Sequence, residues 1–465
     1  MLYRMEDYLD VRTRCSEDSI QIKVDGETYK IAYPTTIWRQ LGDDARRFIA
    51  DHIAFLATNY LPLLLGRKGA IYDTKLPMFE CFSFKSMMYD LPSSAILDDK
   101  ETTQYLRDFF NLDFVFESDD PIVWNRGFTP EKRAIISFTS GKDSLLTLAV
   151  CRELELEPIL INVVEPSNTH EHKYKSEILQ SLNEEFGIKY HVVQNDIGIF
   201  HDSTRFGLEE TSLGWGNQLL YYLFLYLPFV YHYKARYLFF GNELSCDKEI
   251  VGPQSFRANF CYDQSSHWTR QMDMLLRNVT LGSSRVGSLV GPLNELAVMK
   301  CLHEGFPQLA KYQMSCFCDV PSAETHRWCC SCSKCARNYA FLAALGIDPK
   351  RLGFWRDMFS EDCLKFFPLF DGQETFGFDK SGLGRDEQQL AFFLASMHFP
   401  ENEFLQNLLK RSKYICEQDE KDISGIFKED YSHYLATHDY QAIPKELRDR
   451  VYQIYSDILS RNGMV

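Results

Sequence analysis

Apolar and polar positions follow two periods along this chain, and each period predicts a different kind of element. Near the N-terminus, 20–24 alternates apolar and polar residues, Asp25-Gly26 follows, and 28–33 alternates again. Alternation on both sides of Asp-Gly predicts a β-hairpin. Helical spacing follows from about 43 to 65. We therefore expect residues 1–130 to form a separate α+β unit, in which no catalytic motif is apparent.

Short apolar runs and helical spacing alternate through residues 131–345. The predicted strands are 134–138, 158–164, 190–193 and 237–240, and the predicted helices are 144–154, 174–186 and 219–231. Strands that alternate with helices predict an α/β fold with a doubly wound parallel sheet. Such sheets bind ligands at the carboxyl ends of their strands. Residues 346–465 read as a helical C-terminal unit.

Composition supports a folded chain of several units. At 465 residues the chain exceeds one average domain of roughly 150 residues, and 45% of its residues are apolar, enough for a large core. The net charge of 50 − 65 = −15 disfavours broad binding to nucleic acid, which needs a basic surface. Acidic residues follow Met1 where a signal peptide would begin its apolar run, and the apolar windows read as buried helices. We expect a cytoplasmic protein without membrane segments.

A junction between a predicted strand and a predicted helix has the composition of an anion-binding loop. It consists of Thr139, Ser140, Gly141, Lys142, Asp143 and Ser144. The first N–H groups of a helix point at a ligand, and a glycine lets the backbone approach a phosphate closely. The hydroxyls can donate to phosphate oxygens, the lysine adds positive charge, and the aspartate suits Mg²⁺ or an orienting role. A capped helix without any ligand would carry similar residues.

Six of the 14 cysteines fall between Cys316 and Cys335. One tight cluster in a long chain without a signal peptide indicates thiolates that bind a metal. The spacing assigns tetrahedral Zn²⁺ to Cys316, Cys329, Cys332 and Cys335, with Cys318 or Cys330 as alternative ligands. An iron–sulfur cluster is the alternative metal group. Four thiolates close the coordination shell, so we expect a structural role.

The loop resembles the PP-loop of ATP pyrophosphatases, whose usual pattern is Ser-Gly-Gly-x-Asp-Ser/Thr. Thr139 takes the serine position and Ser140 takes the first glycine position. A PP-loop followed by this cysteine pattern resembles the 7-cyano-7-deazaguanine synthase family, over roughly residues 131–345. Trp215-Gly216-Asn217 stands where that family has Gly-Arg-Asn, so the arginine is missing.

The resemblance implies an ATP-dependent C–N ligase that adenylates the carboxylate of 7-carboxy-7-deazaguanine, releases pyrophosphate, and forms an amide or nitrile. It implies ATP, Mg²⁺ and Zn²⁺ as cofactors. Asp143, Lys142 and His172 are the expected catalytic residues, with His170 as an alternative to His172. Enlarged relatives look similar to components of bacterial anti-phage defence operons that couple the deazaguanine to a protein amine. A protein partner or protein substrate from the same operon is therefore expected.

The sequence is also compatible with two other functions. One is another PP-loop ligase, such as a tRNA-modifying enzyme, which the acidic net charge disfavours. The other is a catalytically degenerate PP-loop scaffold subunit of a defence complex. Ser140 in place of glycine and the missing arginine motivate that second reading.

Overall fold

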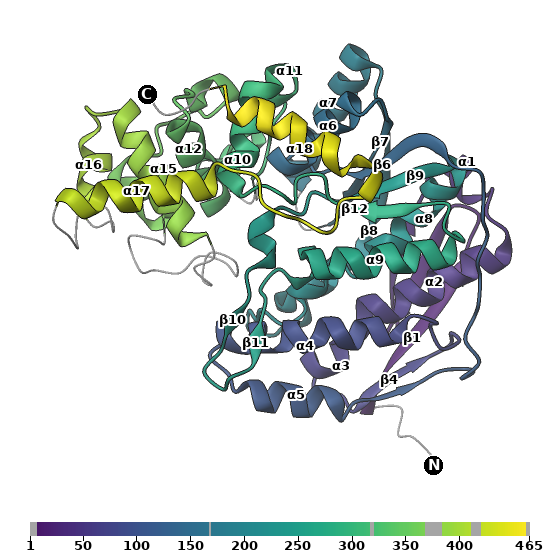
Figure 1. Ribbon diagram of the computed structural model, residues 1–465. Helices are drawn as coiled ribbons and strands as arrows, with labels where there is room; N and C mark the ends of the chain where they lie inside the picture. Colours follow the sequence, from purple (N-terminus) through teal and green to yellow (C-terminus); the bar gives the residue numbers. More distant parts are fainter. Residues whose placement is uncertain (1–6, 167–168, 317–319, 368–383, 411–419, 462–465) are drawn as a thin grey trace.

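The computed structural model describes residues 7–166, 169–316, 320–367, 384–410 and 420–461, and their fold is α/β (Figure 1). Ten strands form one sheet in the order β12-β9-β6-β7-β8-β3-β2-β1-β4-β5. Their bounds are β1 Tyr8–Cys15, β2 Ser19–Val24, β3 Glu27–Ala32, β4 Gly69–Tyr72, β5 Asp113–Val115, β6 Glu131–Ser137, β7 Glu157–Val164, β8 Lys189–Asn195, β9 Ala235–Phe239 and β12 Arg285–Gly287. A small separate sheet pairs β10 Ile250–Val251 with β11 Arg257–Ala258.

The part of the sheet from β12 to β8 is parallel throughout, as the sequence predicts. In chain order its strands take positions 3-2-1-4-5, with β6 first and β9 fourth. The chain runs from β6 to β7 and β8 on one side of β6, and then crosses to β9 and β12 on its other side. The strand order therefore reverses between β6 and β9, whose carboxyl ends flank this switch point. Such a switch point is where doubly wound sheets bind ligands.

These central strands are buried on both faces, which explains their nearly continuous apolar runs. Along β6, Ala134 and Ile136 pack into one core, whereas Ile135 packs into the core on the other face. Helix α6 (Lys142–Glu153), which follows β6, covers the first face, and α8 (Tyr222–His232), which precedes β9, covers the second.

The predicted hairpin is present as β2 and β3, and it joins the central sheet. Asp25 and Gly26 have φ of 46° and 98°, the left-handed pair that a two-residue hairpin turn requires. Strand β3 then pairs antiparallel with β8 through Ile31 opposite Asn195 and Ala32 opposite Gln194. One sheet thus runs through the N-terminal and central parts of the chain. Strands β1, β4 and β5, which complete it, were not predicted.

Helices surround the sheet, and the described part of 346–465 is helical, as expected. The remaining helices are α1 Thr35–Trp38, α2 Asp43–Thr58, α3 Leu61–Leu64, α4 Glu80–Leu97, α5 Thr102–Phe110, α7 Thr169–Phe186, α9 Ser266–Val279, α10 Glu295–Lys300, α11 Pro307–Ala310, α12 Ser333–Ala344, α15 Arg385–His398, α16 Glu403–Leu409, α17 Glu420–Tyr434 and α18 Lys445–Leu459. The predicted helix at 43–65 is divided into α2 and α3, with Pro62 in the first turn of the second. Helix α15 packs on α12 at one end of the molecule (Figure 1).

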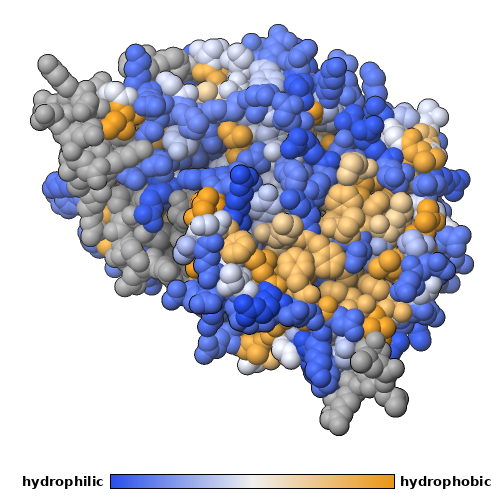
Figure 2. Space-filling model, turned by 60° about the horizontal axis from the view of Figure 1, so that its bottom comes forward, coloured by the Kyte–Doolittle hydropathy of each residue, from blue (hydrophilic) through white to orange (hydrophobic). Residues whose placement is uncertain are grey.

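The helices and the surface show where apolar side chains are concentrated. None of the helices in the described ranges is long and apolar enough to cross a lipid bilayer. Figure 2 shows apolar side chains gathered on the underside of the molecule, the side on which Figure 1 places α3, α4 and α5. Among the large apolar side chains of α4 and α5, Met88 and Phe110 are exposed.

Candidate functional site

The predicted phosphate loop lies between β6 and α6, at the switch point of the sheet. Gly141 has φ −71° and ψ 166°, so the backbone is extended until the helix starts at Lys142. The N–H of Thr139 donates to Ser144 Oγ at 3.3 Å, and Ser144 Oγ donates to the carbonyl of Gly141 at 3.2 Å. These bonds fold the loop over the first turn of α6, and the first N–H groups of a helix are suited to bind an anion.

Ser140 adopts the left-handed conformation that the glycine of the PP-loop pattern would adopt freely. Its φ is 62°, and its carbonyl accepts a hydrogen bond from the N–H of Met314 at 2.9 Å. Its side chain is fully buried, and among the described residues its Oγ has no hydrogen-bond partner. Ser140 is not among the residues that line the adjoining cavity, so this side chain lies apart from the other two loop hydroxyls.

Lys142 and Asp143 form a salt bridge, but of the two only Asp143 lines the cavity. The Lys142 ammonium is buried, 2.9 Å from both carboxylate oxygens of Asp143 and 3.2 Å from Glu295 Oε2. Burial alone would lower the pKa of Lys142, but the carboxylates of Asp143 and Glu295 hold it above its ordinary value. Asp143 lines the cavity, whereas Lys142 does not. Lys142 therefore neutralises acids behind the loop in this structure.

Further carboxylates surround this ion pair from behind. Glu295 also lies 3.5 Å from the guanidinium of Arg337 in α12. Glu387, from α15, accepts a hydrogen bond from the N–H of Leu296 at 2.6 Å, and burial raises the pKa of its carboxyl. Burial, reinforced by Glu295, also raises the pKa of Glu243 to about 7. Helix α10 thus contacts Lys142 through Glu295, and α15 contacts α10 through Glu387.

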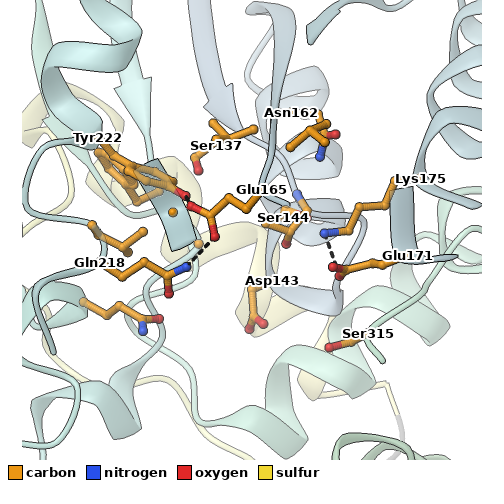
Figure 3. A pocket seen from close by; sticks show the side chains of 18 of the residues that line it. Ser137, Asp143, Ser144, Asn162, Glu165, Glu171, Lys175, Gln218, Tyr222 and Ser315 are labelled. Atoms are coloured by element: carbon orange, nitrogen blue, oxygen red, sulfur yellow. Dashed lines mark hydrogen bonds and ion pairs between the residues drawn. The ribbon is translucent and has the colours of Figure 1, made fainter. Parts of the chain in front are cut away.

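A cavity of about 420 Å³ opens in front of the loop, at the carboxyl ends of β6, β7 and β9 (Figure 3). From the sheet and the loop it is lined by Ser137, Thr139, Asp143, Ser144, Asn162, Val163, Val164, Glu165, Phe240, Gly241 and Asn242. From surrounding segments it is lined by Glu171, His172, Lys175, Gly198, Asp202, Trp215, Gln218, Leu219, Tyr222, Gln264, Ser315 and Lys334. Its volume falls within the range of small-molecule sites.

One wall of the cavity is built around Glu165, which follows β7 directly. Its Oε1 accepts from the Tyr222 hydroxyl at 2.6 Å and from Asn195 Nδ2 at 3.2 Å, and its Oε2 accepts from Gln218 Nε2 at 3.0 Å. Burial raises the pKa of Glu165, while the three donors oppose that shift. A Cβ at position 198 would overlap the Glu165 side chain, so glycine is required there.

The opposite wall carries the cations of the site. Lys175 and Glu171 form an ion pair at 2.7 Å, and Figure 3 shows this pair on the far side of Asp143 and Ser144 from Glu165. His172 also lines the cavity, and burial lowers its pKa. Lys334, from the first turn of α12, reaches the same cavity.

The sequence-predicted site residues are therefore partly brought together. Thr139, Asp143, Ser144 and His172 line the cavity, whereas Ser140, Gly141, Lys142 and His170 do not. Trp215 lines it as well, and the next residue but one, Asn217, is buried with its Nδ2 2.9 Å from Asp90 Oδ2.

The four predicted metal ligands lie in one cluster. The sulfur atoms of Cys316, Cys329, Cys332 and Cys335 all lie within 4.8 Å of one another. The Cys335–Cys316 and Cys329–Cys335 sulfur distances are 3.5 and 3.8 Å. Four sulfurs about 2.3 Å from a tetrahedral ion would lie about 3.8 Å apart, so the cluster could hold a metal such as zinc.

Backbone N–H groups complete the environment of the sulfurs. The N–H of Cys329 donates to Cys316, that of Ser331 to Cys329, and that of Cys335 to Cys332, at 3.3 to 3.4 Å. Such donors stabilise thiolates. Cys330 lies outside the cluster with φ 53°, where the family pattern has glycine, and Cys318 lies outside the described residues.

Several residues of the site were not predicted from the sequence. Glu165 was findable, because a polar residue directly after an apolar strand marks the carboxyl edge of a parallel sheet. Glu295 and Glu387 carry no comparable signal, since only the packing of α10 and α15 brings them to Lys142.

Comparison of the chain with models of known protein families gives no match, and comparison with curated proteins gives no significant relative.

Proposed function

We propose that this protein uses ATP to adenylate a carboxylate and then transfers the acyl group to an amine. The observation that carries the proposal is the loop at 139–144. It joins a central strand to a helix at the switch point of a parallel sheet and opens onto a cavity with Asp143 at its edge. This arrangement favours a nucleotide whose phosphate chain lies on the N-terminus of α6.

In the proposed reaction, an oxygen of the substrate carboxylate attacks the α phosphorus of ATP. The bond from that phosphorus to the α–β bridging oxygen breaks, and pyrophosphate leaves. The amine nitrogen then attacks the acyl carbon, AMP leaves, and the amine proton passes to a base. Positioning and neutralisation of phosphate charge supply most of the catalysis. In this proposal the loop N–H groups and Lys175 stabilise the leaving pyrophosphate, and His172 accepts the proton; both side chains line the cavity.

The resemblance to 7-cyano-7-deazaguanine synthases makes 7-carboxy-7-deazaguanine the proposed acid, and ammonia or a protein amine the proposed acceptor. Asp143 is the residue that would hold Mg²⁺ here, because its side chain lines the cavity and carboxylate oxygen is a ligand that Mg²⁺ prefers. Bound Mg²⁺ would neutralise the phosphate charge. The cysteine cluster would hold Zn²⁺ and fix the segment that brings Ser315 and Lys334 to the cavity.

Exchange of labelled pyrophosphate into ATP, dependent on the deazaguanine acid, tests this function. We expect exchange in the wild type and formation of AMP with no ADP, because the cleavage is between the α and β phosphates. Asp143→Asn should abolish exchange while the protein stays folded, because Lys142 keeps its pairing with Glu295. The matched control is Glu153→Gln, an exposed acid at the far end of the same helix, which should keep full exchange.

Formation of ADP would contradict the proposal, since it indicates cleavage of the terminal phosphate. Exchange at the wild-type rate in Asp143→Asn would also contradict it at this loop. Absence of both nucleotide binding and turnover would instead favour a scaffold subunit.

A further inference from the structure

The wall of the cavity around Glu165 presents two hydrogen-bond acceptors side by side. A carboxylate offers about four acceptor positions, and three of those on Glu165 are taken by Tyr222, Asn195 and Gln218. Oε1 receives two of the three donors, so the remaining position is on Oε2. Because Gln218 turns its Nε2 toward that same oxygen, the Oε1 of Gln218 is the neighbouring acceptor.

The orientation of this pair is set by the surrounding residues. An ionised carboxylate only accepts, so the amide of Gln218 must donate to Glu165. Tyr222, from α8, and Asn195, at the end of β8, donate to Glu165 from two different elements of the fold. The acceptor pair is therefore fixed before any ligand arrives, which favours specific recognition.

Aromatic side chains line the same cavity as the acceptor pair. Tyr222, Phe240 and Trp215 line the same cavity, and Trp215 is 50% exposed. A large aromatic residue exposed at the edge of a cavity is typical of sites that stack a planar ring. Asp143 and Ser144 of the loop lie between this wall and the Lys175–Glu171 ion pair (Figure 3). The cavity thus has one end for phosphate and another for a planar heterocycle.

We propose that Glu165 and Gln218 form the subsite that selects the acid substrate, by accepting from two adjacent N–H groups of a planar heterocycle. An aminopyrimidinone ring, with its ring N–H beside an exocyclic amino group, presents this pair of donors. The corresponding edge of adenine presents an acceptor beside a donor, so the base of ATP does not suit this wall. This inference rests on the proposed function for the identity of the acid, because a deazaguanine carries an aminopyrimidinone edge.

The test compares 7-carboxy-7-deazaguanine with the analogue that lacks only the 2-amino group, 7-carboxy-7-deazahypoxanthine. Titration calorimetry measures the affinity of the full chain for each acid, alone and with a non-hydrolysable ATP analogue. We expect the wild type to prefer the amino compound by about ten- to a hundredfold, as for the loss of one hydrogen bond to a charged group. Glu165→Gln should lose that preference while its affinity for the ATP analogue stays unchanged.

Two further variants keep the test decisive. Glu177→Gln carries the same substitution on an exposed turn of α7, and should retain the preference. Gln218→Leu removes the second acceptor, and should reduce the preference even if Glu165→Gln fails to fold. Circular dichroism and the melting temperature establish that each variant is folded.

Equal affinity of the wild type for both acids, no affinity for either under both conditions, or a preference that survives in both subsite variants would overturn the subsite. The subsite and the reaction fail separately. If the wild type prefers the amino compound but shows no pyrophosphate exchange, the subsite is supported and adenylation is contradicted. If both acids drive pyrophosphate exchange equally, adenylation is supported and the subsite is contradicted.

Discussion

The carboxylate of Asp90, in α4, accepts a hydrogen bond from the N–H of Gly216 at 3.0 Å, and a Cβ at position 216 would overlap its Oδ1. Asp90 and a side chain at 216 therefore exclude each other. Gly216 stands where the resembled family has arginine. Position 216 accommodates only glycine because it packs against α4, a helix from the N-terminal part of the chain. Asp90 also accepts a hydrogen bond from Asn217, and so holds the segment that carries Trp215 at the cavity wall.

We expect Gly216→Ala to lower the free energy of unfolding by about 1–3 kcal/mol, because the added methyl group meets a buried carboxylate. Asp90→Ala relieves that overlap but leaves the N–H of Gly216 unpaired. The double variant should thus lose less stability than the sum of the two single variants. Urea unfolding measures all three. Gly425→Ala, in the exposed part of α17, is the control and should be neutral or slightly stabilising. Strict additivity would contradict the contact.

The pH dependence of stability should carry the signature of Asp90. Burial raises its pKa from 3.8 to about 7. An acid whose folded-state pKa is raised binds more protons in the folded state, so its contribution to stability is full below pH 3.8 and is lost as pH rises toward 7. Between pH 4 and 7, the wild type should lose on the order of 1–3 kcal/mol relative to Asp90→Asn. Parallel stability curves for the two proteins would argue against this shift.

Ser140 should be replaceable by glycine with a gain in stability. Glycine adopts φ of 62° without a Cβ penalty and removes a buried hydroxyl that has no partner among the described residues. Ser140→Gly should therefore raise the melting temperature by a few degrees and keep ATP affinity. Ser140→Ala removes the hydroxyl but keeps the strained backbone, so it separates the two effects. A large loss of ATP affinity in Ser140→Ala would show that the hydroxyl contacts phosphate after all.

Lys142→Met should destabilise the protein whether or not nucleotide is present. The substitution leaves the buried carboxylates of Asp143 and Glu295 without this cation, and such losses amount to about 3–5 kcal/mol. Thermal unfolding with and without ATP distinguishes this from a direct phosphate contact, which would appear mainly as lost affinity. Lys132→Met, at an exposed position of β6, is the matched control. A stable Lys142→Met protein that binds no ATP would favour a phosphate contact.

Removal of metal should affect both stability and the cavity. Cys332→Ser should abolish stoichiometric zinc, lower the melting temperature, and raise the KM for ATP, because α12 carries Lys334 into the cavity. Cys330→Ser, outside the cluster, should keep its metal. Metal analysis of both purified proteins measures the difference. Iron in place of zinc would identify an iron–sulfur cluster. Equal loss of metal from both variants would place Cys330 among the ligands.

The sequence was most informative where one element alone determines the signal. The apolar runs at 134–138 and 158–164 predicted the central strands, and Asp25-Gly26 predicted the hairpin, because local periodicity and turn chemistry suffice there. The cysteine spacing identified the sulfur cluster for the same reason. Whether residues 1–130 fold as a separate unit stays a prediction.

The sequence was least informative where distant segments meet. The role of Lys142 at the phosphates stays a prediction, and its pairing with Glu295, which comes from α10, has no signal in the sequence. The short strands β4 and β5 carry too few residues for a clear period, and their pairing depends on β1. The acceptors on Glu165 depend on Gln218 and Tyr222, which follow it by more than fifty residues.

The antiparallel pairing of β3 with β8 has a practical consequence for any shortened version of the protein. A fragment that begins at residue 131 would uncover the backbone of Gln194 and Asn195, together with the apolar residues that α2 covers. An uncovered strand of this kind recruits strands from other molecules. Such a fragment should precipitate or oligomerise on expression, so a soluble, monomeric product with the same ATP chemistry would mean that the shared sheet is dispensable.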